Sequence, residues 1–132
     1  MSFLLDTDTC SAYLKGNGHV QNRFIKYGGQ LHVSIITVGE LFSGVLSIRA
    51  SARLLPGLLA MLKDTTILDV THNVAYTFGM IRAPLLDRGL PAPGMDMMIA
   101  ATALVHNLTV ATHNTQDYAH IPGLRLVDWL AP

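Results

Sequence analysis

Four acidic residues lie inside or beside apolar stretches, where a carboxylate is costly to bury. They are Asp6, Glu40, Asp96 and Asp117. Asp6 closes the apolar run 3–5, Asp96 opens the apolar run 97–105, and Glu40 is the only glutamate of the chain. An isolated buried carboxylate costs several kcal/mol at least. These four side chains must therefore cap a helix, pair with a partner or bind a cation.

Strand-like and helical patterns alternate along the sequence. Strands are predicted at residues 3–5, 31–35, 66–68, 108–111 and 125–127. Helices are predicted around residues 11–14 and 20–26 and at 38–48, 52–62, 73–87 and 96–105, with a kink or break at Pro84 because proline lacks a backbone donor. The alternation predicts an α/β fold in which helices flank a mostly parallel central sheet. A chain of 132 residues has the size of one domain, so residues 1–132 are expected to form a single domain.

The predicted topology brings the four acids to one place. In a parallel sheet, the carboxyl ends of the strands and the first turns of the following helices share an edge, where ligands bind. Asp6 ends the first strand and Glu40 falls in the first turn after the second. Asp96 starts the helix before the strand 108–111, and Asp117 lies just beyond that strand. The four carboxylates are therefore expected to converge.

Converging carboxylates require a counterion. Two like unit charges about 4 Å apart repel by roughly 4 kcal/mol at an effective dielectric constant of about 20. Oxygen ligands without His or Cys partners suit Mg²⁺ or Mn²⁺ rather than zinc. One or two such ions can activate water and stabilise the leaving oxygen of a phosphodiester. Asp8 is close enough to Asp6 in sequence to help orient that water.

Each acid also has an ordinary structural interpretation. Residues 37–40 have the form of a capping box, in which Glu40 bonds back to the start of its own helix. Helix capping could equally explain Asp6 or Asp8 and Asp96, and a turn could explain Asp117. Their joint placement at one sheet edge favours the metal site, because capping does not require it.

Composition limits the remaining possibilities. Half of the residues are apolar and 14% are charged, which favours an apolar interface with a partner or a second copy. No stretch approaches the roughly 18 to 20 apolar residues that span a bilayer, and the N-terminus lacks a secretory signal. With a single cysteine, Cys10, no internal disulfide can form. A cytoplasmic protein without membrane contact is expected.

Charge and histidine content give weaker signals. Nine basic and nine acidic residues cancel, which argues against a broad nucleic-acid footprint but leaves a local groove open. The candidate groove residues are Lys15, Arg23, Lys26, Arg49, Arg53, Arg82 and Arg88, although solvated helix faces explain them more simply. The six histidines show no metal-binding spacing, and Asp64, Asp69, Asp87 and Asp128 are interpreted as solvated.

Four segments in this order resemble the PIN-domain ribonucleases, specifically the VapC toxins of bacterial toxin–antitoxin pairs. The segments are Leu4-Leu5-Asp6-Thr7-Asp8, then Ser34-Ile35-Ile36-Thr37-Val38-Gly39-Glu40-Leu41, then Ile81-Arg82 with Gly94-Met95-Asp96-Met97-Met98-Ile99-Ala100-Ala101, and last Val110-Ala111-Thr112-His113-Asn114-Thr115-Gln116-Asp117-Tyr118 with Ile121-Pro122-Gly123-Leu124. The resemblance runs the length of the chain. It implies a PIN-like three-layer fold with a mostly parallel central sheet.

The resemblance also implies a function. It makes Asp6, Glu40, Asp96 and Asp117 the acidic Mg²⁺ site, with Thr112 and Asn114 as supports. It implies an endoribonuclease in which metal-activated water attacks an RNA phosphodiester. It further implies a small VapB-type antitoxin as partner and a homodimer. Many relatives carry asparagine at position 8, so Asp8 adds a negative charge that could tighten metal binding or alter the number of metals.

Two other functions compete with this hypothesis. Asp6-Thr7-Asp8 after an apolar strand resembles the start of the haloacid dehalogenase phosphatase signature, with Asp6 as nucleophile and Asp8 as acid and base. Cys10 breaks that signature, and the required downstream lysine is missing after Lys63. The second alternative is a non-catalytic PIN-like protein that only binds a partner or RNA.

Overall fold

The computed structural model describes residues 1–131 and contains one five-stranded sheet. The strands are β1 (Phe3–Leu5), β2 (Leu31–Ser34), β3 (Thr66–Leu68), β4 (Thr109–Ala111) and β5 (Leu126–Val127). Their order in the sheet is β3-β2-β1-β4-β5, and every adjacent pair is parallel. The predicted α/β class with a parallel sheet is confirmed.

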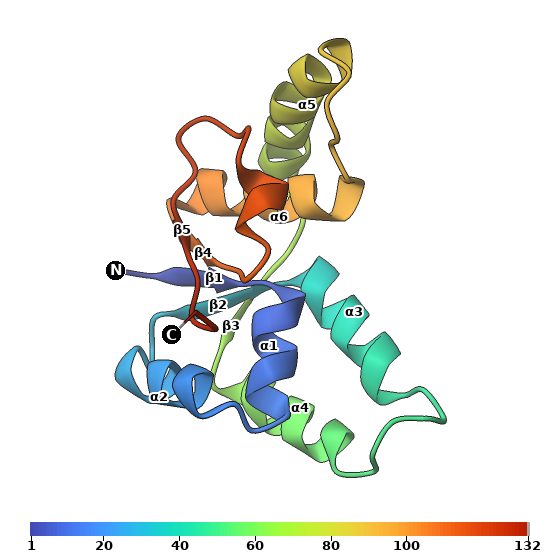
Figure 1. The fold of residues 1–132 in the computed structure, drawn as a ribbon, viewed down its shortest axis with the longest axis vertical. Coiled ribbons are helices and arrows are strands. Elements are labelled where there is room, and N and C mark those ends of the chain that lie inside the picture. The colour runs from blue at the N-terminus through green and yellow to red at the C-terminus, as the bar shows by residue number, and fades with distance from the viewer. Residues whose placement is uncertain (132) are drawn as a thin grey trace.

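Helices connect the strands in the predicted order. They are α1 (Thr7–Leu14), α2 (Gly18–Lys26), α3 (Ile35–Val45), α4 (Leu54–Lys63), α5 (His72–Asp87) and α6 (Gly94–His106), with a 3₁₀ turn η1 (Thr115–Tyr118) after β4. Figure 1 shows α5 and α6 on one side of the sheet and α1, α2 and α4 on the other. No helix within residues 1–131 is both long and apolar enough to cross a membrane.

The central strand β1 separates two hydrophobic cores. Successive strand side chains point to opposite faces, so Leu4 packs with the α5 and α6 residues Leu85 and Met97. Phe3 and Leu5 pack instead with residues of α1 to α4, among them Val20, Phe24, Leu41 and Leu58. Burying such a side chain fully contributes about 1.5–3 kcal/mol. Both cores therefore hold β1 in the middle of the sheet, with its carboxyl end at a fixed point.

The helix containing Pro84 is continuous, so, of the predicted kink or break, the break is wrong. α5 runs from His72 to Asp87 without interruption. Pro84 removes only the bond to the carbonyl of Met80, and both residues are exposed, so water can satisfy that carbonyl. The Pro84 carbonyl still accepts from the amide of Arg88 at 3.2 Å. Pro84 lies only three residues before the end of α5, which limits how much the proline destabilises the helix.

Candidate active site

A small polar pocket lies at the carboxyl edge of the sheet. Its volume is about 210 Å³, and its lining residues come from both ends of the sequence: Asp6, Thr7, Asp8, Glu40, Asp96, Ile99, Asn114 and Tyr118. The elements that meet there are the start of α1 after β1, the second turn of α3, the start of α6 and the segment after β4. Three of the four predicted acids therefore line one pocket, and Asp8 joins them.

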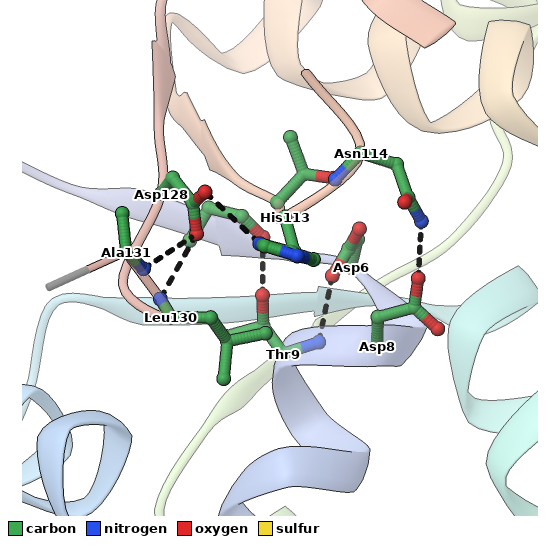
Figure 2. Close-up of polar contacts among 10 residues, drawn as sticks. Asp6, Asp8, Thr9, His113, Asn114, Asp128, Leu130 and Ala131 are labelled. Atoms are coloured by element: carbon green, nitrogen blue, oxygen red, sulfur yellow. Dashed lines mark hydrogen bonds and ion pairs between the residues drawn. The ribbon is translucent and has the colours of Figure 1, made fainter. Parts of the chain in front are cut away.

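Asp6 is the most buried of these acids, with 6% of its surface exposed. It is the N-cap of α1, and its Oδ1 accepts from the amide of Thr9 at 2.8 Å (Figure 2). The Thr9 hydroxyl in turn donates to the Ala111 carbonyl at 2.9 Å, which ties α1 to β4. Burial raises the pKa of Asp6, and hydrogen bonds from Thr112 and Thr9 only partly oppose that rise. The capping interpretation holds for Asp6, and the same side chain still faces the pocket.

Glu40 does not belong to a capping box, so that alternative is wrong. α3 starts at Ile35, three residues earlier than predicted, because the buried Ser34 side chain accepts from the amide of Ile36 at 3.1 Å and caps the helix. Glu40 consequently lies in the second turn rather than the first. Its Oε1 accepts from the hydroxyl of Thr7 at 2.7 Å. That bond joins α3 to the first residue of α1 and holds the carboxylate at the pocket.

Asp96 lies in the first turn of α6 and does not cap it. The helix begins at Gly94 after Pro93, and no side chain caps that end. Burial raises the pKa of Asp96, and nearby carboxylates raise it further. In decreasing order of effect, these are Asp117, Glu40, Asp6 and Asp8. The acids are therefore close enough in space to repel one another.

Asp117 lies beside the pocket rather than in its wall. It is exposed within η1, and its amide donates to the Asn114 carbonyl at 3.0 Å. Its charge is nevertheless the strongest carboxylate influence on the pKa of Asp96. The backbone of Asp117 therefore forms a turn, as the structural interpretation predicted, and its charge also raises the pKa of Asp96 in the pocket.

The segment after β4 is fixed by three polar contacts, and Figure 2 shows those of Asn114 with Asp8 and of His113 with Asp128. The Asn114 amide nitrogen Nδ2 donates to Asp8 Oδ2 across the pocket, and the Asn114 backbone amide donates to Thr112 Oγ1 at 3.0 Å. His113 Nδ1 lies 3.0 Å from Asp128 Oδ2. Asp128 also accepts from the amides of residues 130 and 131 through Oδ1, so the solvated interpretation of Asp128 is wrong.

Sequence reasoning missed Tyr118 as a pocket residue. Only 3% of Tyr118 is exposed, and it lines the pocket next to Ile99. Burial raises the pKa of its phenol, and the charges of Asp96, Asp6, Asp117 and Glu40 raise it further, so the hydroxyl keeps its proton. A protonated phenol can donate a hydrogen bond to an acceptor in the pocket. The available signal was its position directly after Asp117.

The donor set fits a hard divalent cation. The pocket offers carboxylate and amide oxygens, and no His or Cys of the described part of the chain lines it. Within residues 1–131, no three His, Cys, Asp or Glu side chains form a ready-made cage for a metal. Mg²⁺ does not need such a cage, because it keeps several waters and binds through one or two carboxylates together with substrate phosphates. Raised carboxylate pKa values mark the same place, since a cation would relieve that repulsion.

The relationships of the chain agree with this geometry. The family model described as PIN domain matches residues 3–124. The chain belongs to the PIN-domain family. This PIN domain is 34% identical over 130 residues to the tRNA(fMet)-specific endonuclease VapC of Salmonella typhimurium, with 98% of each protein covered.

Solved structures lead to the same group. DNA-bound VapBC from Salmonella typhimurium contains a chain that matches this PIN domain with a TM-score of 0.90 and 34% identity, covering 98% of both chains. A toxin–antitoxin complex from Klebsiella pneumoniae matches with a TM-score of 0.76 and 26% identity, covering 99% of this chain and all of the other. The PIN domain is therefore a VapC-type ribonuclease, a hydrolase of the toxin–antitoxin class. These relationships favour neither the phosphatase nor the non-catalytic alternative, and nucleases of this type generally depend on a divalent metal.

Proposed function

We propose that this PIN domain is a Mg²⁺-dependent endoribonuclease whose metal binds in the pocket lined by Asp6, Glu40 and Asp96, directly to one or two of these carboxylates and through bound water to the rest, with Mn²⁺ as the alternative metal. The supporting observation is the meeting of these carboxylates, from three separate elements, in one pocket at the carboxyl edge of the parallel sheet. A bound divalent ion would supply charge neutralisation at the phosphate and activation of the attacking water. Asp117 adds negative charge from just outside the pocket.

The other pocket residues have supporting roles in this proposal. Thr7 orients Glu40 through its 2.7 Å hydrogen bond. Asn114 donates to Asp8 and so restrains a carboxylate that has no metal-ligand role here, while Thr112 holds the Asn114 backbone. Tyr118 offers a protonated hydroxyl to an acceptor on the substrate. In this proposal the pocket carboxylates bind the cation, and the Tyr118 hydroxyl donates a hydrogen bond to the RNA.

The substrate is proposed to be a transfer RNA, with tRNA(fMet) as the first candidate, because the Salmonella relative carries that specificity in its name. Purified protein incubated with a mixture of cellular tRNAs is expected to cut tRNA(fMet) in Mg²⁺ and to leave it intact in EDTA. Sequencing the cleavage ends would locate the cut. Ends distributed evenly over all tRNAs, or cutting that persists in EDTA, would contradict the substrate or the metal requirement respectively.

Thr7→Val is expected to lower cleavage about twofold to tenfold, because it removes the hydrogen bond that fixes Glu40. The net loss of stability should be about 1 kcal/mol, since both side chains are only partly buried. Steady-state kinetics and thermal unfolding would measure the two effects. Thr66→Val, the same change on the exposed side of β3, is the matched control and should leave cleavage unchanged. Equal kinetics for wild type and Thr7→Val would remove Thr7 from the site.

Partners and setting complete the proposal. We propose one PIN domain over residues 1–132, a small VapB-type antitoxin as inhibitor, and a homodimer acting on cytoplasmic RNA. The antitoxin follows from the toxin–antitoxin complexes among the structural matches. The homodimer is supported by exposed apolar side chains on one helix, Tyr76 and Met80 of α5, which are four residues apart and share a face.

A further inference from the structure

Three basic residues gather at one groove, which has two connected parts. The first part has a volume of about 360 Å³ and is lined by Lys15 and Arg49. The second, of about 510 Å³, is lined by Lys15 and Arg53. The parts share Leu14, Lys15, Ser51 and Leu54, so they form one depression between α1, α3, the segment 46–53 and the start of α4. We call it the basic groove.

The basic groove adjoins the acidic pocket. Glu40 lines both, because it lies in the wall of the 210 Å³ pocket and in the first part of the basic groove. Among the residues that the structure describes, its carboxylate is the only one that lines the groove. A strand whose phosphate lay at the acidic pocket could therefore continue past Glu40 toward Lys15 and Arg49.

The groove cations are available for a ligand. Within residues 1–131, none of Lys15, Arg49 and Arg53 forms an ion pair with a carboxylate. Other basic residues are engaged elsewhere: Arg82 donates to the Ala92 carbonyl at 3.1 Å and lies over the Phe78 ring. Arg23 and Lys26 lie on α2, which Figure 1 places away from α3. The local groove that the neutral net charge left open therefore involves three of the seven candidates.

The groove combines apolar side chains, among them Leu14, Leu41, Val45 and Leu54, with polar groups that suit a sugar–phosphate backbone more than bases. Hydroxyls of Ser11, Ser47 and Ser51 stand among the cations, and both kinds of group bind phosphate oxygens. No aromatic side chain within residues 1–131 lines the groove, so this part of the chain offers no stacking platform of the kind on which proteins bind unpaired bases. Contacts to phosphates carry no sequence information, so base recognition must come from elsewhere.

We propose that the basic groove binds the phosphate backbone of the RNA strand that runs from the scissile bond at the acidic pocket, with Lys15, Arg49 and Arg53 each contacting a phosphate. This inference rests on the proposed nuclease function. Charge complementarity and continuity with the pocket through Glu40 support RNA as the occupant. A peptide of a protein partner is the competing occupant.

The test compares two triple variants that remove the same charge. The groove variant is Lys15→Gln/Arg49→Gln/Arg53→Gln, and the control is Arg23→Gln/Lys26→Gln/Arg88→Gln, whose positions are also exposed. The groove variant should raise KM for tRNA(fMet) about tenfold with little change in kcat, which indicates lost binding rather than lost chemistry. The control should match wild type. Each single groove variant should carry part of the effect, so the test does not depend on folding of the triple variant.

A binding measurement separates this proposal from the catalytic one. In an Asp96→Asn background, fluorescence anisotropy with a labelled oligouridylate reports RNA binding without cleavage. Removing three phosphate contacts should make the dependence of log Kd on log salt shallower by about 2, at roughly 0.7 per phosphate of a single strand. If groove and control variants bind this RNA alike, the groove proposal is overturned even where wild type cleaves RNA. Loss of binding to a co-expressed VapB-type antitoxin, with RNA binding intact, would assign the groove to a protein partner and also overturn the proposal.

Discussion

Asp96→Asn is expected to lower RNA cleavage at least about a hundredfold, because it removes one charge of the electrostatic machinery at the pocket. Asparagine keeps the size and one oxygen of the side chain but not its negative charge. The fold should persist, since Asp96 does not cap α6. Cleavage of tRNA(fMet) in Mg²⁺, followed with circular dichroism of the same samples, would measure both effects.

The control for Asp96→Asn is Asp87→Asn, an identical change at an exposed position in the last turn of α5. It should cleave RNA like wild type. Equal cleavage by Asp96→Asn and wild type would contradict the proposed active site. Loss of cleavage in both variants would instead indicate that global charge, rather than the pocket, controls the reaction.

The order of the elements could be predicted because the sequence separates its apolar runs clearly. The strands at residues 3–5 and 66–68 have the predicted bounds, and glycine and proline clusters mark the connections between elements. The start of α3 could not be predicted as easily. Ser34 and Thr37 both suit a helix start, and the spacing of Thr37 to Glu40 favoured the later one. The helix starts at the earlier position because Ser34 is buried at the end of β2, where its side-chain oxygen accepts a hydrogen bond from the Ile36 amide.

The sheet edge could be predicted for the acids, but their partners could not. Parallel topology alone brings Asp6, Glu40 and Asp96 to one edge. The bonds that orient the pocket join residues far apart, such as Thr7 to Glu40, separated by 33 positions, and Asn114 to Asp8, separated by 106. No local pattern encodes such pairs, because they depend on how α1, α3 and the segment after β4 pack. The same holds for the basic groove, whose three cations come from two distant places along the chain, Lys15 and the segment 46–53.

Asp6 shows that capping and catalysis do not exclude each other. One oxygen caps α1 through the Thr9 amide while the residue also lines the pocket. Capping fixes the carboxylate without neutralising it, since burial still raises its pKa. A sequence pattern that fits a cap is therefore no argument against a ligand role at the end of a strand.

Mg²⁺ is expected to raise the melting temperature of the wild-type protein. A ligand present at about 100 times its Kd stabilises the folded state by about 2.7 kcal/mol when it binds the folded state alone. Asp96→Asn should lose most of this gain, because it removes one carboxylate of the pocket. Asp87→Asn should keep it. Thermal melts in Mg²⁺ and in EDTA would measure the difference, and identical melts of wild type in both would contradict a shared metal site.

Without metal, Asp96→Asn is expected to stabilise the protein at neutral pH, raising its melting temperature by a few degrees. Burial and neighbouring carboxylates raise the pKa of Asp96 above its ordinary value of 3.8, so the ionised form destabilises the folded state. A raised carboxyl pKa means that the folded protein binds the proton more tightly than the unfolded chain, so this destabilisation fades as pH falls through the folded-state pKa toward 3.8. The advantage of Asp96→Asn over wild type in EDTA should therefore be largest near neutral pH and shrink on acidification. An advantage that stayed constant with pH would show that repulsion at Asp96 is not its cause, because only the wild-type side chain can take up the proton that relieves it.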